Sequence, residues 1–176
     1  MNTSHLRQFP QITAPYCIAL EKSIGAIIFR HVKKGDEQKI EYLLMRYPHG
    51  HWEFPRGHVE PGEQNEHITM YREIEEETGI TKKDLEVQKN FREYYCFSYR
   101  ARGDEKTDRI KNKKCLFIRK RVVFYLAKSI KDDVLLSHEH QEFEWLPIDQ
   151  AIEKLTFSNA KKVIIKANRH LIKKSD

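Results

Sequence analysis

The segment that most restricts what this chain can fold into runs from Gly57 to Ile80, with the sequence GHVEPGEQNEHITMYREIEEETGI. Its Pro61-Gly62 pair marks a turn, and the residues that follow contain neither proline nor glycine until Gly79. Asn65 is a favoured N-cap residue, and a glycine commonly follows the last residue of a helix. The segment therefore predicts a turn that leads into a helix from about Asn65 to Thr78.

Three carboxylates of this helix are expected on one face. At about 100° per residue, Glu73, Glu76 and Glu77 lie at positions i, i+3 and i+4, whereas Glu75 points roughly away. Like charges at these spacings destabilise an isolated helix by about 0.2–0.5 kcal/mol per pair, and the macrodipole disfavours anions near the C-terminus. A hard divalent cation removes this repulsion because Mg²⁺ takes oxygen ligands. The pattern indicates a cation site, and the alternative is a solvated acidic face.

The whole segment resembles the Nudix box, which joins a glycine loop to a helix of glutamates. The matching residues are Gly57, Glu63, Arg72, Glu73, Ile74, Glu76, Glu77, Gly79 and Ile80. Eight residues separate Glu63 from Arg72, where the Nudix pattern has seven. The helical half matches without a gap, so the geometry of the carboxylates is expected to be kept. The pairing of Glu63 with Arg72 is left open.

The resemblance implies an α/β/α sandwich in which helices flank a mixed β-sheet. It also implies that Mg²⁺ or Mn²⁺ is bound by the carbonyl of Gly57 and by Glu73, Glu76 and Glu77, and that a nucleoside diphosphate linkage is hydrolysed. Arg72 is then expected to orient the acidic cluster. Glu73, Glu76 and Arg72 are therefore candidate catalytic residues.

The rest of the chain is compatible with this sandwich. Stretches rich in apolar, β-branched and aromatic residues predict strands at about 17–29, 40–46, 52–54, 85–99, 115–127 and 143–146. Asp149 is expected to cap one helix, and a last helix is expected after Ser158. The apolar stripe of this last helix comprises Ala160, Val163, Ile164, Ala167 and Leu171. Residues 1–15 are expected to be flexible, and residues 100–114 are expected to form a mobile loop.

The chain of 176 residues predicts a single domain over residues 1–176. It has no apolar run near the ~20 residues of a membrane span, and its first residues lack the apolar stretch of a signal peptide. A cytoplasmic protein without a membrane partner or an obligatory protein partner is expected. Cys17, Cys96 and Cys115 lack CxxC spacing, so reduced thiols are expected.

Outside the Nudix box, the stretch LSHEHQEFEWL and its surroundings resemble asymmetrical diadenosine tetraphosphate hydrolases. That resemblance implies a dinucleoside polyphosphate substrate, cut to ATP and AMP. Glu139 lies six residues before Trp145 and is the candidate for a further metal ligand or general base, with Glu142 as the fallback. The alternative is that Glu139 lies in a solvated turn.

The candidate substrate contacts are Arg56, Lys114, Lys120, Phe124 and His140. Tyr94, Phe124 and Tyr125 are the aromatic candidates for stacking on an adenine, with core packing as the alternative for each. The resemblance favours Phe124, and Tyr125 must then face the other side of the same strand. The net charge of +6 and the basic segment at 109–121 suggest contact with phosphate. An RNA 5′ end is therefore also a possible partner.

Besides a nucleic-acid-binding protein with an incidental acidic helix, two further hypotheses compete with the dinucleotide substrate. One is another Nudix reaction, either the removal of pyrophosphate from RNA 5′ ends or the hydrolysis of nucleoside triphosphates or nucleotide sugars. The other is a module that binds a nucleotide or RNA without chemistry. The intact Glu73, Glu76 and Glu77 argue against a binding module.

Overall fold

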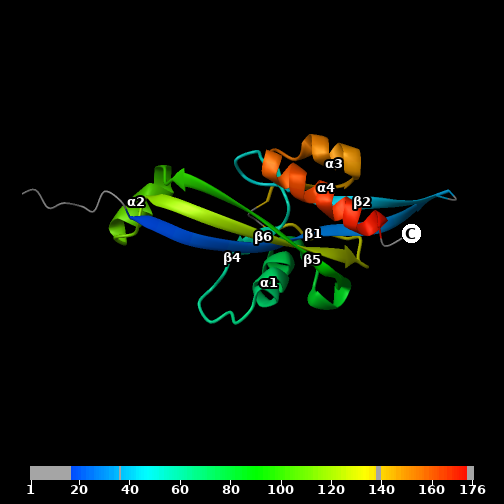
Figure 1. Ribbon diagram of the computed structural model, residues 1–176, viewed down its shortest axis with the longest axis horizontal. Coiled ribbons are helices and arrows are strands. Elements are labelled where there is room, and N and C mark those ends of the chain that lie inside the picture. The colour runs from blue at the N-terminus through cyan, green and yellow to red at the C-terminus, as the bar shows by residue number, and fades with distance from the viewer. Residues whose placement is uncertain (1–16, 36, 138–139, 174–176) are drawn as a thin grey trace, which may run out of the picture. The chain divides into compact units, whose positions relative to one another are not determined.

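The computed structural model describes residues 17–35, 37–137 and 140–173 (Figure 1). The expected flexible segment at 1–15 lies outside these residues. The chain divides into two compact units, of which unit 1 comprises Met1–Leu20 and Ser98–Arg119. Unit 2 comprises Glu21–Phe97 and Lys120–Asp176. The single domain over residues 1–176 stays a prediction.

Seven strands of the described residues form one sheet, in the order β3-β2-β1-β6-β5, with β4 paired to β1 and β7 paired to β2. The strands are β1 (Ile18–Lys34), β2 (Glu37–Arg46), β3 (Trp52–Glu53), β4 (Arg56–His58), β5 (Leu85–Arg100), β6 (Phe117–Ser129) and β7 (Glu142–Pro147). The first two predicted strands form a hairpin, since β1 and β2 pair antiparallel with Phe29 opposite Tyr42.

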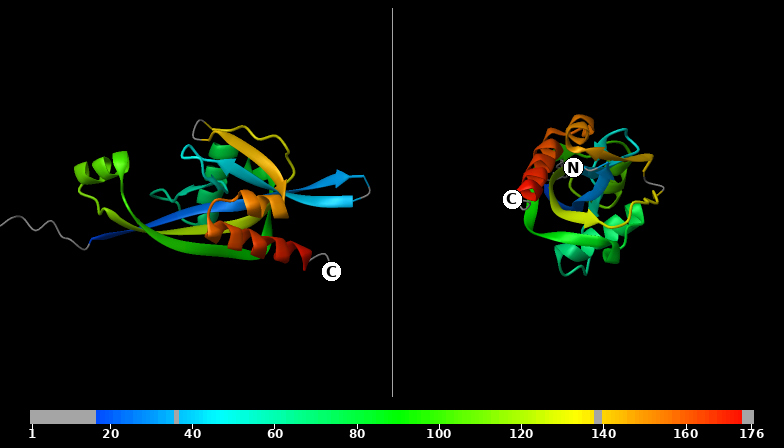
Figure 2. Two further views of the ribbon diagram at one scale, coloured as in Figure 1. Left: turned by 90° about the horizontal axis from the view of Figure 1, so that it is seen from above. Right: turned by 90° about the vertical axis from the view of Figure 1, so that its right-hand side faces the viewer.

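The helices of unit 2 cover both faces of its sheet, which gives the predicted α/β/α sandwich. They are α1 (Glu66–Thr78), the 3-10 helix η1 (Lys82–Asp84), α3 (Ile148–Lys154) and α4 (Ser158–Ile172). Side chains alternate along β1, so Ile27 and Phe29 pack with α3 and α4, while Ala26 and Ile28 pack with α1. Figure 1 and Figure 2 show α1 on one side of the sheet and α3 with α4 on the other.

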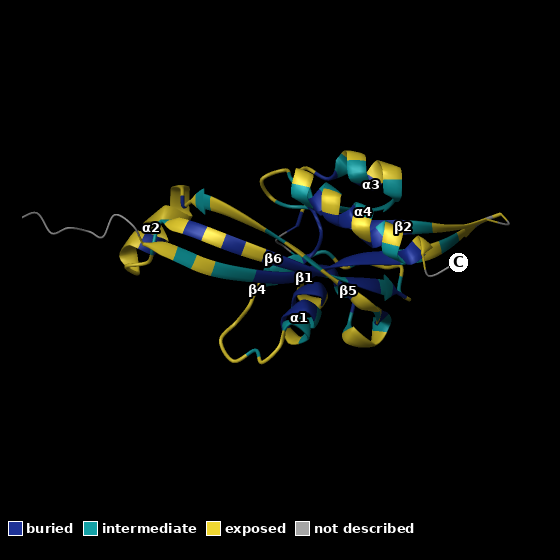
Figure 3. Ribbon diagram, in the orientation of Figure 1, coloured by how far each residue is buried: buried dark blue, intermediate teal, exposed yellow. Residues whose placement is uncertain are grey.

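The last helix carries its apolar stripe as predicted. Its buried residues are Ala160, Val163, Ile164, Ala167 and Leu171, and Figure 3 shows this alternation of buried and exposed positions. The prediction that Asp149 caps α3 is wrong, because the helix begins at Ile148 and Pro147 is the N-cap. Asp149 instead lies in the first turn, where the helix dipole favours a carboxylate. No helix of the described residues is long and apolar enough to cross a membrane.

Unit 1 contains a helix where a mobile loop was expected. Helix α2 (Gly103–Lys111) occupies most of the segment, and Glu105 pairs with Arg109 one turn later at 2.8 Å. The side chain of Arg109 is buried and also donates to the carbonyl of Cys115. These contacts hold together a helix that has little apolar surface of its own.

The expectation of three reduced thiols is corrected by a disulfide between Cys17 and Cys115 in unit 1. The two residues lie 98 positions apart in the sequence, and their Cα atoms are 5.2 Å apart, within the usual range for a disulfide. Spacing in the sequence does not reveal this proximity, because it arises from the fold. Cys96 remains free and exposed.

Candidate active site

Helix α1 begins and ends at the predicted residues. The side chain of Asn65 accepts hydrogen bonds from the backbone N–H groups of His67 and Ile68, at 3.0 and 3.2 Å. Gly79 has a φ of 66° and closes the helix with a bond from its N–H to the carbonyl of Glu75. Met70 and Ile74 are completely buried against the sheet, which fixes the helix and the direction of its acidic face.

The acidic face of α1 lies in a pocket of about 380 Å³. Its lining residues are Tyr47, Arg56, Gly57, His58, Glu60, Arg72, Glu73, Glu76 and Glu77. The predicted convergence of Glu73, Glu76 and Glu77 is therefore confirmed, and Glu75 is exposed outside the pocket. Loop, short strand and helix each supply part of one concave, highly charged surface.

Arg72 is the centre of the carboxylate cluster. Its Nε donates to Glu63 Oε1 at 2.8 Å, and its Nη1 donates to Glu73 Oε1 at 2.8 Å and to Glu76 Oε2 at 3.1 Å. Its Nη2 donates to the carbonyl of His58 at 2.8 Å. The pairing of Glu63 with Arg72 thus survives the extra residue between them.

Glu63 is held as an anion by this network. The Arg72 guanidinium lowers the pKa of Glu63 to about 2, and hydrogen bonds from the Thr69 hydroxyl and the Glu60 N–H act in the same direction. The same contacts raise the pKa of Arg72, which stays charged. Glu63 and Arg72 therefore form a fixed ion pair beneath the acidic face.

Glu73 lies against the backbone of Gly57. A Cβ atom at position 57 would overlap the Glu73 carboxylate, so only glycine allows this close approach. Burial raises the pKa of Glu73, while the neighbouring Arg72 acts in the opposite direction. The loop of β4 and the helix thereby bring a carboxylate and a bare backbone segment together.

Glu77 is the most enclosed of the three carboxylates Glu73, Glu76 and Glu77 on the acidic face of α1. Its Oε2 accepts from the backbone N–H of Arg56 at 2.9 Å, and its Oε1 lies 3.5 Å from His140 Nε2. Its side chain is only 6% exposed, compared with 59% for Glu76. The pocket therefore has one enclosed carboxylate, that of Glu77, and one exposed carboxylate, that of Glu76, which bonds to Arg72.

The donor atoms of the pocket suit a hard divalent cation. Oxygen ligands are what Mg²⁺ prefers, and the lack of a side chain at Gly57 lets the Glu73 carboxylate lie directly against the backbone of the loop. The described His, Cys, Asp and Glu side chains do not already form a group arranged around an ion, because Arg72 lies among the carboxylates. The residue types fit the cation, and its binding requires the cluster to open around Arg72.

Two cationic side chains of unit 2 flank the acidic face. Arg56 lines the pocket with its guanidinium 5.5 Å from the centroid of the Tyr47 ring, and its Nε is buried without a hydrogen-bond partner among the described residues. Lys120 is buried, with its Nζ 3.0 Å from His58 Nε2. Burial and the adjacent Lys120 ammonium lower the pKa of His58. Arg56 thus brings positive charge into the pocket, and Lys120 brings it next to His58, which lines the pocket.

The other predicted site residues lie elsewhere or are enclosed. Lys114 belongs to unit 1 and is exposed, and Glu139 falls outside the described residues.

The side chain of His140 has no exposed surface. It packs beside Glu77, and its Nδ1 lies within hydrogen-bond distance of Ser137 Oγ, at 3.1 Å. That burial corrects the expected substrate contact of His140, which instead supports the loop and Glu77. Glu142, the fallback for Glu139, is exposed and lies 3.4 Å from Arg46.

The proposed stacking role of Phe124 is contradicted by its burial. Phe124 is 0% exposed, and its ring packs 5.3 Å from the centroid of Phe54 and 5.9 Å from that of Tyr95. Core packing, the alternative reading of the sequence, describes it better. Tyr125 faces the opposite side of β6, as the alternation of strand residues requires.

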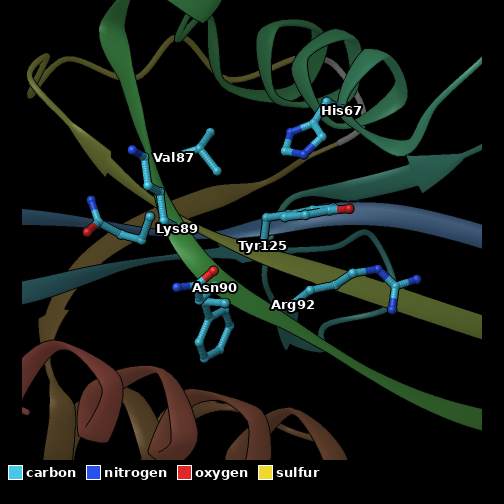
Figure 4. A pocket seen from close by; sticks show the side chains of 8 residues that line it. His67, Val87, Lys89, Asn90, Arg92 and Tyr125 are labelled. Carbon is cyan, nitrogen blue, oxygen red and sulfur yellow. The ribbon is translucent and has the colours of Figure 1, made fainter.

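Tyr125 lines a second pocket, of about 530 Å³, between α1 and strands β5 and β6 (Figure 4). Its ring lies 4.4 Å from that of His67, and its hydroxyl donates to Glu66 at 2.6 Å. Arg92 points toward the same region and forms two hydrogen bonds with Glu66, each of 2.7 Å. The lining of this pocket contains no carboxylate, so it lacks the chemistry of the acidic site.

Tyr47 is one of three lining residues of the pocket that were not predicted from the sequence, together with His58 and Glu60. Its ring lines the pocket, stacks on His51 at 4.7 Å, and meets His140 edge-on at 4.5 Å. Its hydroxyl donates to the carbonyl of Phe54. The signal available in the sequence was its position directly after the second predicted strand, at about 40–46.

Known proteins are similar to this chain in both sequence and fold. The NUDIX domain family matches residues 22–167. The bis(5′-nucleosyl)-tetraphosphatase [asymmetrical] of Rattus norvegicus is 36% identical over 85% of this chain and 95% of its own length. More distantly, the RNA pyrophosphohydrolase of Pseudoalteromonas translucida is 32% identical over 63% of this chain and 67% of its own length.

A solved structure is also similar to this chain. The crystal structure of a C. elegans Ap4A hydrolase binary complex has 33% sequence identity and a TM-score of 0.68, and the match covers 86% of this chain and 98% of that chain. The mixed sheet between helices and the acidic helix behind a glycine loop agree with this likeness. The chain therefore belongs to the Nudix hydrolase family.

Proposed function

We propose that the chain hydrolyses dinucleoside polyphosphates asymmetrically, cutting diadenosine tetraphosphate to ATP and AMP with Mg²⁺ or Mn²⁺ as the cofactor. The observation that carries the proposal is the gathering of Glu73, Glu76 and Glu77 beside the bare backbone of Gly57. The name of the rat relative supplies the substrate, and the family supplies the reaction class.

In this proposal the acidic face and the glycine loop hold the cation. Glu73, Glu76, Glu77 and the carbonyl of Gly57 would be its protein ligands, with Glu139 as a further ligand or general base. When bound, a divalent cation neutralises phosphate oxygens and makes water nucleophilic near neutral pH. Water then adds to one phosphorus, and the bond from that phosphorus to a bridging oxygen breaks.

The remaining charged residues position the reactants. Arg72 holds Glu73 and Glu76 in place through the hydrogen bonds of one guanidinium nitrogen. The Nε–H of Arg56 is buried and has no hydrogen-bond partner among the described residues, so a phosphate oxygen could accept a hydrogen bond from it. Lys120 adds positive charge beside His58, one of the lining residues of the pocket. Preorganised cations of this kind stabilise the charge that develops on the leaving oxygens.

Product analysis tests the proposal directly. Diadenosine tetraphosphate incubated with the protein and Mg²⁺ should yield ATP and AMP in equal amounts, and EDTA should stop the reaction. Two molecules of ADP per substrate would contradict asymmetric cleavage. Hydrolysis in ¹⁸O-labelled water then identifies the attacked phosphorus, because the label appears in only one of the two products.

Removal of pyrophosphate from RNA 5′ ends is the second candidate, favoured by the more distant likeness to an RNA pyrophosphohydrolase. A 5′-triphosphorylated RNA in the same assay separates the two. Faster cleavage of that RNA than of the dinucleotide would select the second candidate. Binding of both substrates without turnover would instead select a module that has no chemistry.

A further inference from the structure

Almost all of the net charge of this protein is concentrated in unit 1. Residues 98–119 contain eight Lys and Arg and three Asp and Glu, a net charge of +5, whereas the whole chain has a net charge of +6. Surplus charge that only improved solubility would not need to be gathered in 22 residues. Such a concentration instead favours association with a polyanion.

The cations of unit 1 are available for such a partner. Six of them are exposed and have no ion pair within the described part of the chain, namely Arg102, Lys106, Lys111, Lys113, Lys114 and Arg119. The three acids of residues 98–119 are too few to balance these cations, since Glu105 already pairs with the buried Arg109 and only Asp104 and Asp108 remain. The positive charge of the surface is therefore not cancelled by neighbouring side chains.

An exposed aromatic ring lies in the same unit. Phe117, on β6, is 48% exposed, and the guanidinium of Arg100 lies 5.4 Å from its ring centroid. Arg119 is two residues further along the strand, and the intervening Ile118 is buried, so Phe117 and Arg119 share the solvent face. A ring with a guanidinium beside it offers a flat surface on which a nucleobase can stack.

We propose that unit 1 binds single-stranded nucleic acid, with backbone phosphates on its exposed cations and an unpaired base stacked at Phe117. Bases in a duplex are stacked on one another, so the ring selects a single strand. A membrane surface fits less well, because an amphipathic helix needs an apolar face and Ile110 is the sole large apolar side chain exposed on α2. This inference goes beyond hydrolysis and does not depend on it.

Fluorescence anisotropy of the full chain with a 5′-hydroxyl RNA of about 12 nucleotides tests the proposal. EDTA in the buffer and the missing 5′ phosphates keep the acidic pocket out of the measurement. Phe117→Ala should weaken binding by about 5- to 100-fold, because stacking on one aromatic ring is lost, whereas Phe117→Tyr should keep the affinity. The ring is exposed, so circular dichroism should show both variants folded.

The phosphate contacts are tested by the salt dependence of the same binding. Lys106→Gln combined with Lys113→Asn should lower the slope of log K against log salt by about 1.4, since each lost contact to a single strand removes about 0.7. Asparagine is chosen at position 113 because Lys113 has a φ of 52°, which asparagine tolerates. The matched control is Lys162→Gln with Lys173→Gln, two exposed lysines of unit 2, and it should leave the slope unchanged.

Three results would overturn the proposal. Equal losses from the paired variants of unit 1 and unit 2 would show a general charge effect with no particular surface. Unchanged affinity in Phe117→Ala would remove the stacked base. Binding to vesicles of phosphatidylserine and phosphatidylcholine without binding to RNA would assign the surface to a membrane. A failure of hydrolysis would not affect any of these measurements, so the two proposals can fall separately.

Discussion

Arg72 lets a set of like charges exist on one helix before any metal ion binds. Its guanidinium contacts Glu63, Glu73 and Glu76 and is also held by the carbonyl of His58. Because the guanidinium is planar and always charged, it can serve several carboxylates at fixed angles, which a lysine could not do. The acidic face is thus preorganised by an internal cation, and a metal ion has to displace part of this network.

Glu76→Gln should abolish most of the hydrolysis while leaving the protein folded. The side chain of Glu76 is 59% exposed and, among the residues that the structure describes, bonds only to Arg72, so its charge is not needed for packing. The neutral amide can no longer balance the charge of the cation. We expect kcat/KM to fall by the factor that corresponds to a loss of several kcal/mol in transition-state stabilisation. The measurement is the rate of release of ATP and AMP, together with thermal unfolding.

Glu75→Gln is the matched control, because it removes the same charge from the next residue on the outer side of the helix. It should leave kcat/KM within about a factor of two, since surface substitutions of this kind have small effects. If Glu76→Gln were as active as Glu75→Gln, the acidic face of α1 would not be the reaction centre.

Glu63→Gln should destabilise the protein in a manner that depends on pH. The pKa of Glu63 is lowered from 4.5 to about 2, chiefly by Arg72. A lowered pKa stabilises the folded state fully above 4.5, and this contribution is lost as the pH falls toward about 2. We expect the variant to be less stable by about 2 kcal/mol at neutral pH, as for other buried hydrogen bonds to a charged group.

Urea unfolding of the wild type and of Glu63→Gln at several pH values provides the check. The difference between the two proteins should be constant above the ordinary carboxyl pKa and should shrink in acid. A difference that stays the same down to pH about 2 would mean that the ion pair with Arg72 does not stabilise the fold.

Residues on α1 could be predicted from spacing, while enclosed residues from elsewhere could not. Glu73, Glu76 and Glu77 follow from helical periodicity, which is a local property of the sequence. The burial of Phe124 depends on Phe54 and Tyr95, which are far away in sequence and contribute rings to the same core. His140 is hidden by a comparable long-range contact with Tyr47.

At the scale of the element, the N-cap Asn65 determines where α1, the helix that carries the acidic face, begins. Asn65→Ala should lower the free energy of unfolding by about 1 kcal/mol, because the backbone N–H groups of His67 and Ile68 lose their acceptor. Asn65→Asp keeps an acceptor at this position and should stay close to the wild type. Urea unfolding of the two variants provides the check. If any substitution at position 65 destabilised the protein regardless of capping, the free energy of unfolding would fall equally in Asn65→Ala and Asn65→Asp.

Helix α2 shows why one element escaped prediction. The segment is strongly charged and has few apolar residues, so it lacks the periodic stripe by which helices are normally predicted from sequence. Its stability comes from the ion pair of Glu105 with Arg109 and from the bond between Arg109 and the carbonyl of Cys115. The first contact is visible as an i, i+4 pattern, whereas the second needs the folded chain.

At the scale of the whole molecule, the layers follow from strands that are apolar on both faces. Ile24, Ala26, Ile27, Ile28 and Phe29 on β1 are all buried, and they are divided between two core clusters. Such a run predicts a sheet covered on both sides, and the Nudix resemblance predicted the same sandwich. The disulfide could not be found in this way, because no sequence pattern connects residues that are 98 positions apart.

The disulfide leads to a prediction about the intact molecule. Denatured without a reductant, the chain should show one reactive thiol, that of Cys96, and after reduction it should show all three cysteines. Cys96→Ser should show none before reduction and two after it. Replacing Cys17 and Cys115 with serine should lower the free energy of unfolding by about 2–5 kcal/mol, since a cross-link between such distant residues restricts the unfolded chain. Three reactive thiols in the unreduced protein would mean that the fold brings these two cysteines together without joining them.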